Sequence, residues 1–116
     1  MAKDELRERL SKIEEYVRKI PEECMKPEKA AECVEAAKEM YYLGLGLLGP
    51  GAEAQDRWKA LALCRDAVAA LQTACEQCRE KHKNTEQSLQ EEGNMYAMNS
   101  AKFLFRRTEQ LIVGVM

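Results

Sequence analysis

Three residues near the middle of the chain have side chains that bind metal ions in many proteins. Cys75, Cys78 and His82 form a C-x2-C-x3-H pattern, and thiolate and imidazole groups are preferred ligands of zinc. On one helix, the first and last of them would lie about 10 Å apart along the axis. All ligands of a tetrahedral zinc lie within about 2.3 Å of the ion. At most two of the three could share one metal, with the rest coming from Cys24 or Cys33. We therefore expect buried thiols, no metal and no cofactor.

The remaining patterns of catalytic chemistry are absent from the sequence. His82 is the only histidine and stands in a charged stretch, which is typical of a solvated helix end. The chain has no G-x-S-x-G motif, no phosphate-binding glycine loop after a strand, and no Glu-x-x-His motif of di-metal bundles. The Cys75–Cys78 pair falls mid to late in its expected helix, whereas a redox pair needs the helix N-terminus. We therefore expect a protein that is not an enzyme.

Composition limits the class of partner and the compartment. The 116 residues carry a net charge of −2 with 33% charged residues, which argues against nucleic acid as a partner, since its binders show dense basic faces. The N-terminus runs directly into charged residues, without the apolar segment of a signal peptide. The longest apolar runs, Met40 to Leu48 and Leu111 to Met116, are too short to span a bilayer. Five cysteines with three on one helix face favour reduced thiols in the cytoplasm.

Turn residues divide the chain into four helical segments. We expect helices over Lys3 to Lys19, ended by Pro21, and from Pro27 to the Gly49-Pro50-Gly51 turn. A third helix runs from Ala52 to Lys81. The fourth is capped at Asn84, Thr85 or Ser88, with Gly93-Asn94 as either a turn or a tolerated weak point. The fold class is all-α: one domain over residues 1–116, an antiparallel four-helix bundle in which the third and fourth helices form a long hairpin.

Apolar side chains recur at steps of three and four in every segment, which is the spacing of one helix face. The first helix also carries acid-before-base pairs at i and i+4, each worth about 0.2–0.5 kcal/mol: Glu5/Arg9, Glu8/Lys12, Glu14/Arg18 and Glu15/Lys19. The rows expected to be buried are Leu6, Leu10, Ile13, Val17 and Ile20; Ala30, Cys33, Val34, Ala37, Met40, Tyr41 and Leu48; Ala60, Leu61, Leu63, Cys64, Ala67, Val68, Ala70, Leu71, Ala74, Cys75 and Cys78; and Ala97, Met98, Ala101, Leu104, Phe105, Thr108, Leu111, Ile112 and Val115.

Residues outside these rows favour binding to another protein. Tyr96, Phe103 and Arg107 form a stripe beside the buried row of the last helix, and Trp58 begins the third helix. Aromatic and arginine side chains of this kind are frequent interface anchors. The alternative is that Tyr96 and Phe103 pack against the first or second helix. The acid-rich stretch Glu22 to Glu39 fits either a basic partner or a solvated face.

Two segments resemble the MIT family, a three-helix module of microtubule-interacting and trafficking proteins. The second helix of the family commonly reads A-L-x-L-Y-x-x-A-V/I, and Ala60 to Val68 is similar, with Cys64 in place of tyrosine. Its third helix commonly ends R-A-E-x-L, and Arg107-Thr108-Glu109-Gln110-Leu111 is similar, with threonine in place of alanine. The resemblance implies binding of short peptide motifs in grooves between helices. The partners would be ESCRT filament subunits or an autophagy adaptor, with Arg107, Glu109 and Leu111 beside such a groove.

We therefore predict a non-catalytic protein-interaction module, an adaptor that binds a peptide or partner helix in a groove between helices, in trafficking or autophagy. The residues expected to bind are Trp58, Tyr96, Phe103, Arg107, Glu109 and Leu111. The alternative is a self-associating or engineered bundle with a structural role, in which the apolar C-terminus, Leu111 to Met116, packs on another copy to form a homo-oligomer.

Overall fold

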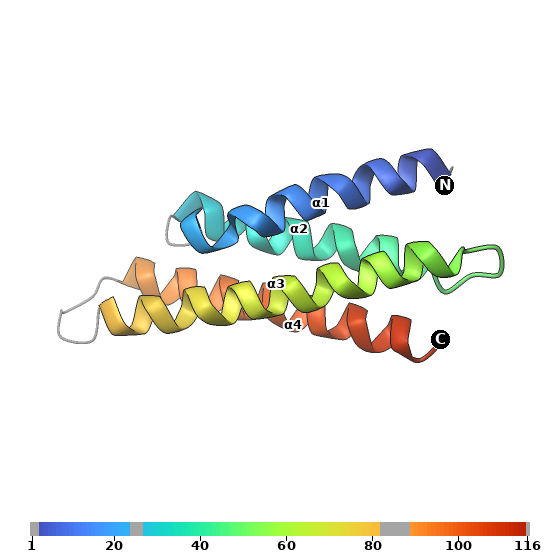
Figure 1. Cartoon of the computed structure of the whole chain (residues 1–116). Coiled ribbons are helices and arrows are strands. Elements are labelled where there is room, and N and C mark those ends of the chain that lie inside the picture. The colour runs from blue at the N-terminus through green and yellow to red at the C-terminus, as the bar shows by residue number, and fades with distance from the viewer. Residues whose placement is uncertain (1–2, 24–26, 82–88, 116) are drawn as a thin grey trace.

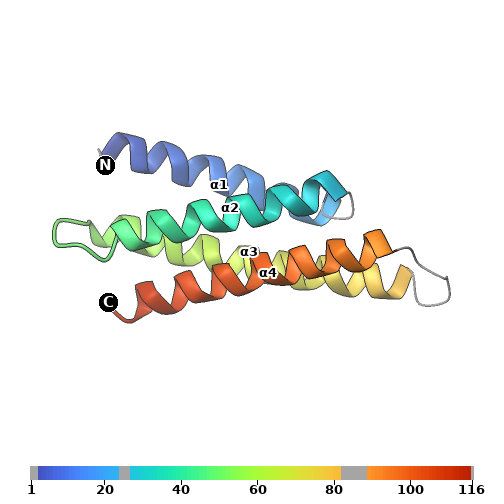
Figure 2. The same cartoon turned by 180° about the vertical axis from the view of Figure 1, so that it is seen from behind.

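The computed structural model describes residues 3–23, 27–81 and 89–115, and the side chains within 4–20, 28–76 and 93–115 of these ranges. Four helices follow one another: α1 (Lys3–Glu23), α2 (Pro27–Gly46), α3 (Ala54–Lys81) and α4 (Leu89–Val113). They form an elongated all-α bundle of 52 × 24 × 18 Å in which consecutive helices run antiparallel (Figures 1 and 2). The predicted fold class and the long α3–α4 hairpin are confirmed.

The helices are arranged around the bundle in the order α1, α2, α4, α3. α2 packs most extensively on α4, α3 packs on α4 and on α1, and α1 and α4 do not touch within the described residues. The neighbours α1 and α3 therefore run in the same direction, as do α2 and α4 (Figure 1). The α2–α3 connection crosses the end of the bundle, because α2 and α3 stand at opposite corners and scarcely meet.

The boundary predicted for the first helix was wrong. α1 does not end before Pro21 but continues to Glu23. A proline removes one N–H donor and disfavours helix in the residue before it. That residue is Ile20, which is buried in the core, and its packing holds the backbone in the helical form. The second helix does begin at Pro27, and α4 runs through Gly93 and Asn94 without a turn. Asn84, Thr85 and Ser88 lie outside the described residues.

A single core joins all four helices, and the predicted apolar rows supply most of it. α1 contributes Leu10, Ile13, Val17 and Ile20. α3 contributes most of both expected rows, with Val68 and Ala70 only partly buried and the side chain of Cys78 outside the described residues. The row on α4 is displaced from the prediction: Leu104 and Leu111 are only half-buried, and Val115 is exposed beyond the end of the helix. The most buried residues of α4 are instead Met98, Ala101, Phe105, Thr108 and Ile112.

Among the described residues, no helix combines the length and apolar character that crossing a bilayer requires.

Three of the four predicted ion pairs on α1 form, with N–O distances of 3.1 Å for Glu5–Arg9, 3.8 Å for Glu8–Lys12 and 2.7 Å for Glu14–Arg18. They lie on the solvent side of a helix whose other side is fully covered, as an amphipathic element requires.

Candidate interaction surfaces

The outer face of α4 carries two large aromatic side chains in solvent. Tyr96 is 77% exposed and Phe103 is 68% exposed, and their separation of seven residues places them two helical turns apart, about 10 Å along one face. The alternative that they pack against α1 or α2 was therefore wrong. Because Phe105 fills the core on the other side of the helix, Phe103 has to point away from it.

The surface around Phe103 is hollowed and positively charged. A shallow depression of about 310 Å³ is lined by Phe103, Arg106, Arg107 and Gln110. Neither arginine forms an ion pair with a described residue. The acid of this part of α4, Glu109, is instead held by Arg65 of α3 at 3.0 Å. The two guanidinium groups are thus free to meet carboxylates of another molecule.

The other residues predicted to bind lie away from this face. Glu109 links α4 to α3 through Arg65, and Leu111 is half-buried. Trp58 is 59% exposed but stands near the start of α3, and the Arg65–Glu109 pair sets a register that places it level with the end of α4. The structure brings together Tyr96, Phe103 and Arg107 and leaves Trp58 on a separate surface.

A second concave surface lies between α1 and α2, where the sequence predicted none. Its volume is about 650 Å³, and it exists because α1 packs mainly on α3 and touches α2 sparingly. Tyr16 connects the two walls by donating a hydrogen bond to Cys33 Sγ at 2.8 Å. The groove is lined by Arg9, Lys12, Ile13, Tyr16, Glu32, Glu35, Ala36, Lys38, Glu39 and Tyr42. The acids of the stretch Glu22 to Glu39 were the only sequence signal, and they do not reveal which helix faces them.

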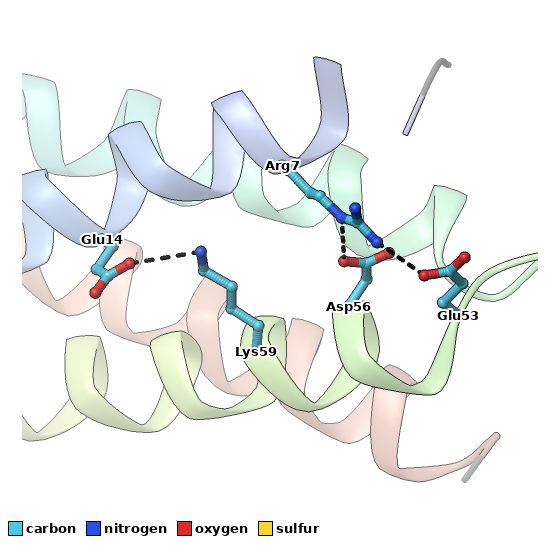
Figure 3. Close-up of polar contacts among 5 residues, drawn as sticks. All are labelled: Arg7, Glu14, Glu53, Asp56 and Lys59. Carbon is cyan, nitrogen blue, oxygen red and sulfur yellow. Dashed lines mark hydrogen bonds and ion pairs between the residues drawn. The ribbon is translucent and has the colours of Figure 1, made fainter. Parts of the chain in front are cut away.

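Polar contacts across the α1–α3 interface position α1 (Figure 3). Arg7 Nε lies 3.3 Å from Asp56 Oδ1 and Arg7 Nη2 lies 2.8 Å from Glu53 Oε2. Asp56 is only 3% exposed, and its hydrogen bond and charge raise the pKa of the Arg7 guanidinium above its ordinary value. Further along both helices, Lys59 Nζ of α3 lies 3.6 Å from Glu14 Oε2 of α1. These contacts tie α1 to α3 and to the residue that precedes α3.

The three thiols that the structure describes also belong to the core. Cys33, Cys64 and Cys75 are buried and form no disulfide. Burial, reinforced by the charge of Glu109, raises the pKa of the Cys64 thiol to about 12, so it stays protonated and unreactive at neutral pH. Among the residues that the structure describes, no group of His, Cys, Asp and Glu side chains is placed to hold a metal ion. The side chains of Cys78 and His82 lie outside that set.

No family model, no curated protein and no solved structure matches the chain. The two segments whose sequences resemble the MIT family lie on α3 and α4.

Proposed function

We propose that the chain is a non-catalytic protein-interaction module whose α4 outer face docks against a partner. The observation that carries the proposal is the solvent exposure of Tyr96 and Phe103 on one helix face beside Arg106 and Arg107. Exposing two large aromatic rings gives up the free energy of burying them, about 1.5–3 kcal/mol for a side chain of this size. Aromatic and arginine side chains are also the residue types that dominate interface energetics.

The geometry favours a partner that receives α4 as a helix. Tyr96, Phe103 and Arg107 occupy positions i, i+7 and i+11, the spacing of anchors that a groove reads from a helix. A suitable partner offers an apolar cleft for the rings and carboxylates for the two arginines, since Arg–carboxylate pairs are directional and bidentate. This form of binding differs from the groove-bound peptide that the MIT resemblance implies, because here the helix is the inserted element.

The setting that we propose is the cytoplasm, in an adaptor of trafficking or autophagy. Three buried thiols without a disulfide support a reducing compartment. The segments 60–68 and 107–111 resemble MIT helices, and this resemblance supports a role in trafficking or autophagy. Both parts of this setting are separate from the binding surface and are tested by other means, such as localisation of a fluorescent fusion in cells.

Affinity capture from a lysate with matched variants tests the binding surface. Phe103→Ala and Arg107→Glu are expected to lose the proteins that the wild type retains, whereas Trp58→Ala and Arg18→Glu, equally exposed changes on α3 and α1, are expected to keep them. Circular dichroism should show unchanged helicity in all four. Retention of the same proteins by Phe103→Ala and Arg107→Glu would show that α4 does not carry the interaction.

A further inference from the structure

The two walls of the groove between α1 and α2 carry opposite charges. Arg9 and Lys12 stand on the α1 side. Three acids stand on the α2 side at positions i, i+3 and i+7, namely Glu32, Glu35 and Glu39. Lys38 is the one cation among the α2 residues that line the groove. The floor between the walls is apolar, formed by Ile13 and Ala36 with the ring of Tyr16. One face of the molecule thus has a positive and a negative edge on either side of an apolar centre.

These charges are available to a second molecule. Arg9 and Lys12 have only intrahelical partners, Glu5 at 3.1 Å and Glu8 at 3.8 Å. On α2, Glu35 pairs with Lys38 at 3.5 Å and Glu32 with Lys29 at 3.1 Å. All four pairs are solvent-exposed and join residues of one helix, and such pairs are weak enough to be exchanged for contacts with another molecule. Glu39 is half-buried and forms no ion pair with any described residue. A carboxylate that is partly desolvated without a counter-charge gains most from an incoming cation.

The register of the two helices places these charges at the same height. Tyr16 meets Cys33, and α1 and α2 run antiparallel (Figure 2). Counting seven residues back from Tyr16 along α1 reaches Arg9, and counting seven forward from Cys33 along α2 reaches position 40. Arg9 is therefore level with position 40, and so with the adjacent Glu39 across the groove. Lys12 is level with position 37, between Glu35 and Glu39. The two edges are therefore complementary to each other in position as well as in sign.

We infer that this face binds a second copy of the same chain, with a two-fold axis running along the groove. Such an axis lays α1 of one copy over α2 of the other, at the same height. Arg9 then meets Glu39 of the second copy and Lys12 meets the second copy's Glu35, and each contact occurs twice because the interface is isologous. A two-fold axis across the groove would instead lay α1 over α1 and oppose like charges, so the charge pattern selects the first arrangement.

Tyr42 supplies an apolar anchor for this interface. Its side chain is 71% exposed at the end of the groove. Tyr42 follows Glu35 by seven residues and therefore lies on the same face of α2, two turns further along. By the register above it is level with position 7 of α1, so in the dimer its ring would be covered by α1 of the second copy. This surface is distinct from the apolar C-terminus, where the sequence had suggested self-association, and from the α4 face of the proposed function.

Charge-swapped variants test the arrangement by analytical ultracentrifugation over a concentration series. Arg9→Glu/Lys12→Glu makes both edges acidic, and Glu35→Lys/Glu39→Lys makes both edges basic. Each variant alone is expected to dimerise about tenfold or more weakly than the wild type, because every contact becomes a like-charge pair. An equimolar mixture of the two is expected to restore dimers, since every contact in the mixed dimer is again between opposite charges.

Two further measurements complete the test. Tyr42→Ala should weaken the wild-type dimer, and raising the salt from about 0.05 M to about 0.5 M should weaken it too, because the screening length shortens several-fold. Circular dichroism of each variant checks that the exposed changes leave the bundle folded. A wild type that stays monomeric at millimolar concentration, or a mixture that stays as monomeric as its components, would overturn the inference. Neither outcome bears on partner capture by α4.

Discussion

A close approach between α2 and α4 leads to a sharp prediction about stability. α2 and α4 approach each other at Gly44, where an added Cβ would lie 2.6 Å from Thr108 Cγ2. Thr108 cannot easily yield: it is fully buried, and its hydroxyl donates a hydrogen bond to the Leu104 carbonyl at 2.9 Å. Gly44→Ala should therefore destabilise the protein, although alanine is the better helix former.

The magnitude follows from comparison with a glycine in open space. Gly93 is also helical, is exposed, and has no atom within 4 Å of an added Cβ. Gly93→Ala should gain about 0.5–1 kcal/mol from helix propensity. Gly44→Ala gains the same term but suffers overpacking of about 1–3 kcal/mol. The difference in the free energy of unfolding between the two variants is therefore the steric cost at Gly44. We place this cost at about 2 kcal/mol, with Gly93→Ala the more stable variant.

Urea denaturation followed by circular dichroism measures this difference. With a slope of about 2 kcal/mol/M, the two midpoints should differ by about 1 M. Thr108→Ser removes Cγ2 and keeps the hydroxyl, so it should recover most of the loss when combined with Gly44→Ala, giving a coupling free energy of about 1 kcal/mol or more. If Gly44→Ala stabilises the protein as much as Gly93→Ala does, α2 and α4 are not in contact at this glycine.

Three other changes have expected outcomes in the same assay. Arg7→Met leaves the buried carboxylate of Asp56 without its cation and should lower the urea midpoint more than Arg9→Met, which breaks only a pair within α1; equal midpoints would contradict a role for Arg7 in compensating the Asp56 charge. Arg57→Met removes hydrogen bonds of 2.8 and 3.3 Å to two carbonyls at the α2–α3 turn and should cost about 1–2 kcal/mol. The Cys64 thiol has its pKa raised from 9.0 to about 12 by burial, so its stabilising contribution is complete below pH 9. That contribution should fall by about 1.4 kcal/mol per pH unit between pH 9 and pH 12, and Cys64→Ala should lack this component.

The helices could be predicted from the sequence because local signals and tertiary packing agree along most of the chain. The apolar spacing of α3 is regular from Leu61 to Cys75. α2 ends at Gly46, a little before the predicted stop at Gly49-Pro50-Gly51. Gly51 adopts a φ of 115° in the turn that follows, a conformation that favours glycine. The predicted end of α1 before Pro21 was wrong because local signals and tertiary packing disagree there. Local chemistry opposes a helix there, and burial of Ile20 outweighs it, which only the packed structure reveals.

The candidate surfaces were predictable only in part. The α4 stripe follows from periodicity alone, because Tyr96, Phe103 and Arg107 fall outside the apolar row whatever the neighbours are. The groove between α1 and α2 depends on which helices pack together. The sequence pattern places Arg9 and Glu39 outside the apolar rows, but it does not show that they border the same depression. Likewise, Glu109 looked available for a partner until the structure paired it with Arg65.

The close packing of α2 on α4 and its sparse packing on α1 have one physical cause. The distance between two packed helices is set by the side chains at their contact. α2 presents Gly44 to α4, and Ala37, seven residues earlier, lies on the same face of α2. α2 is therefore drawn close to α4. On its other side, α1 is anchored to α3 by bulky core residues and by the Arg7–Asp56 pair, so α1 cannot follow. The space that opens between α1 and α2 is what remains, and it is bordered by the charged residues of both helices because neither buries that flank.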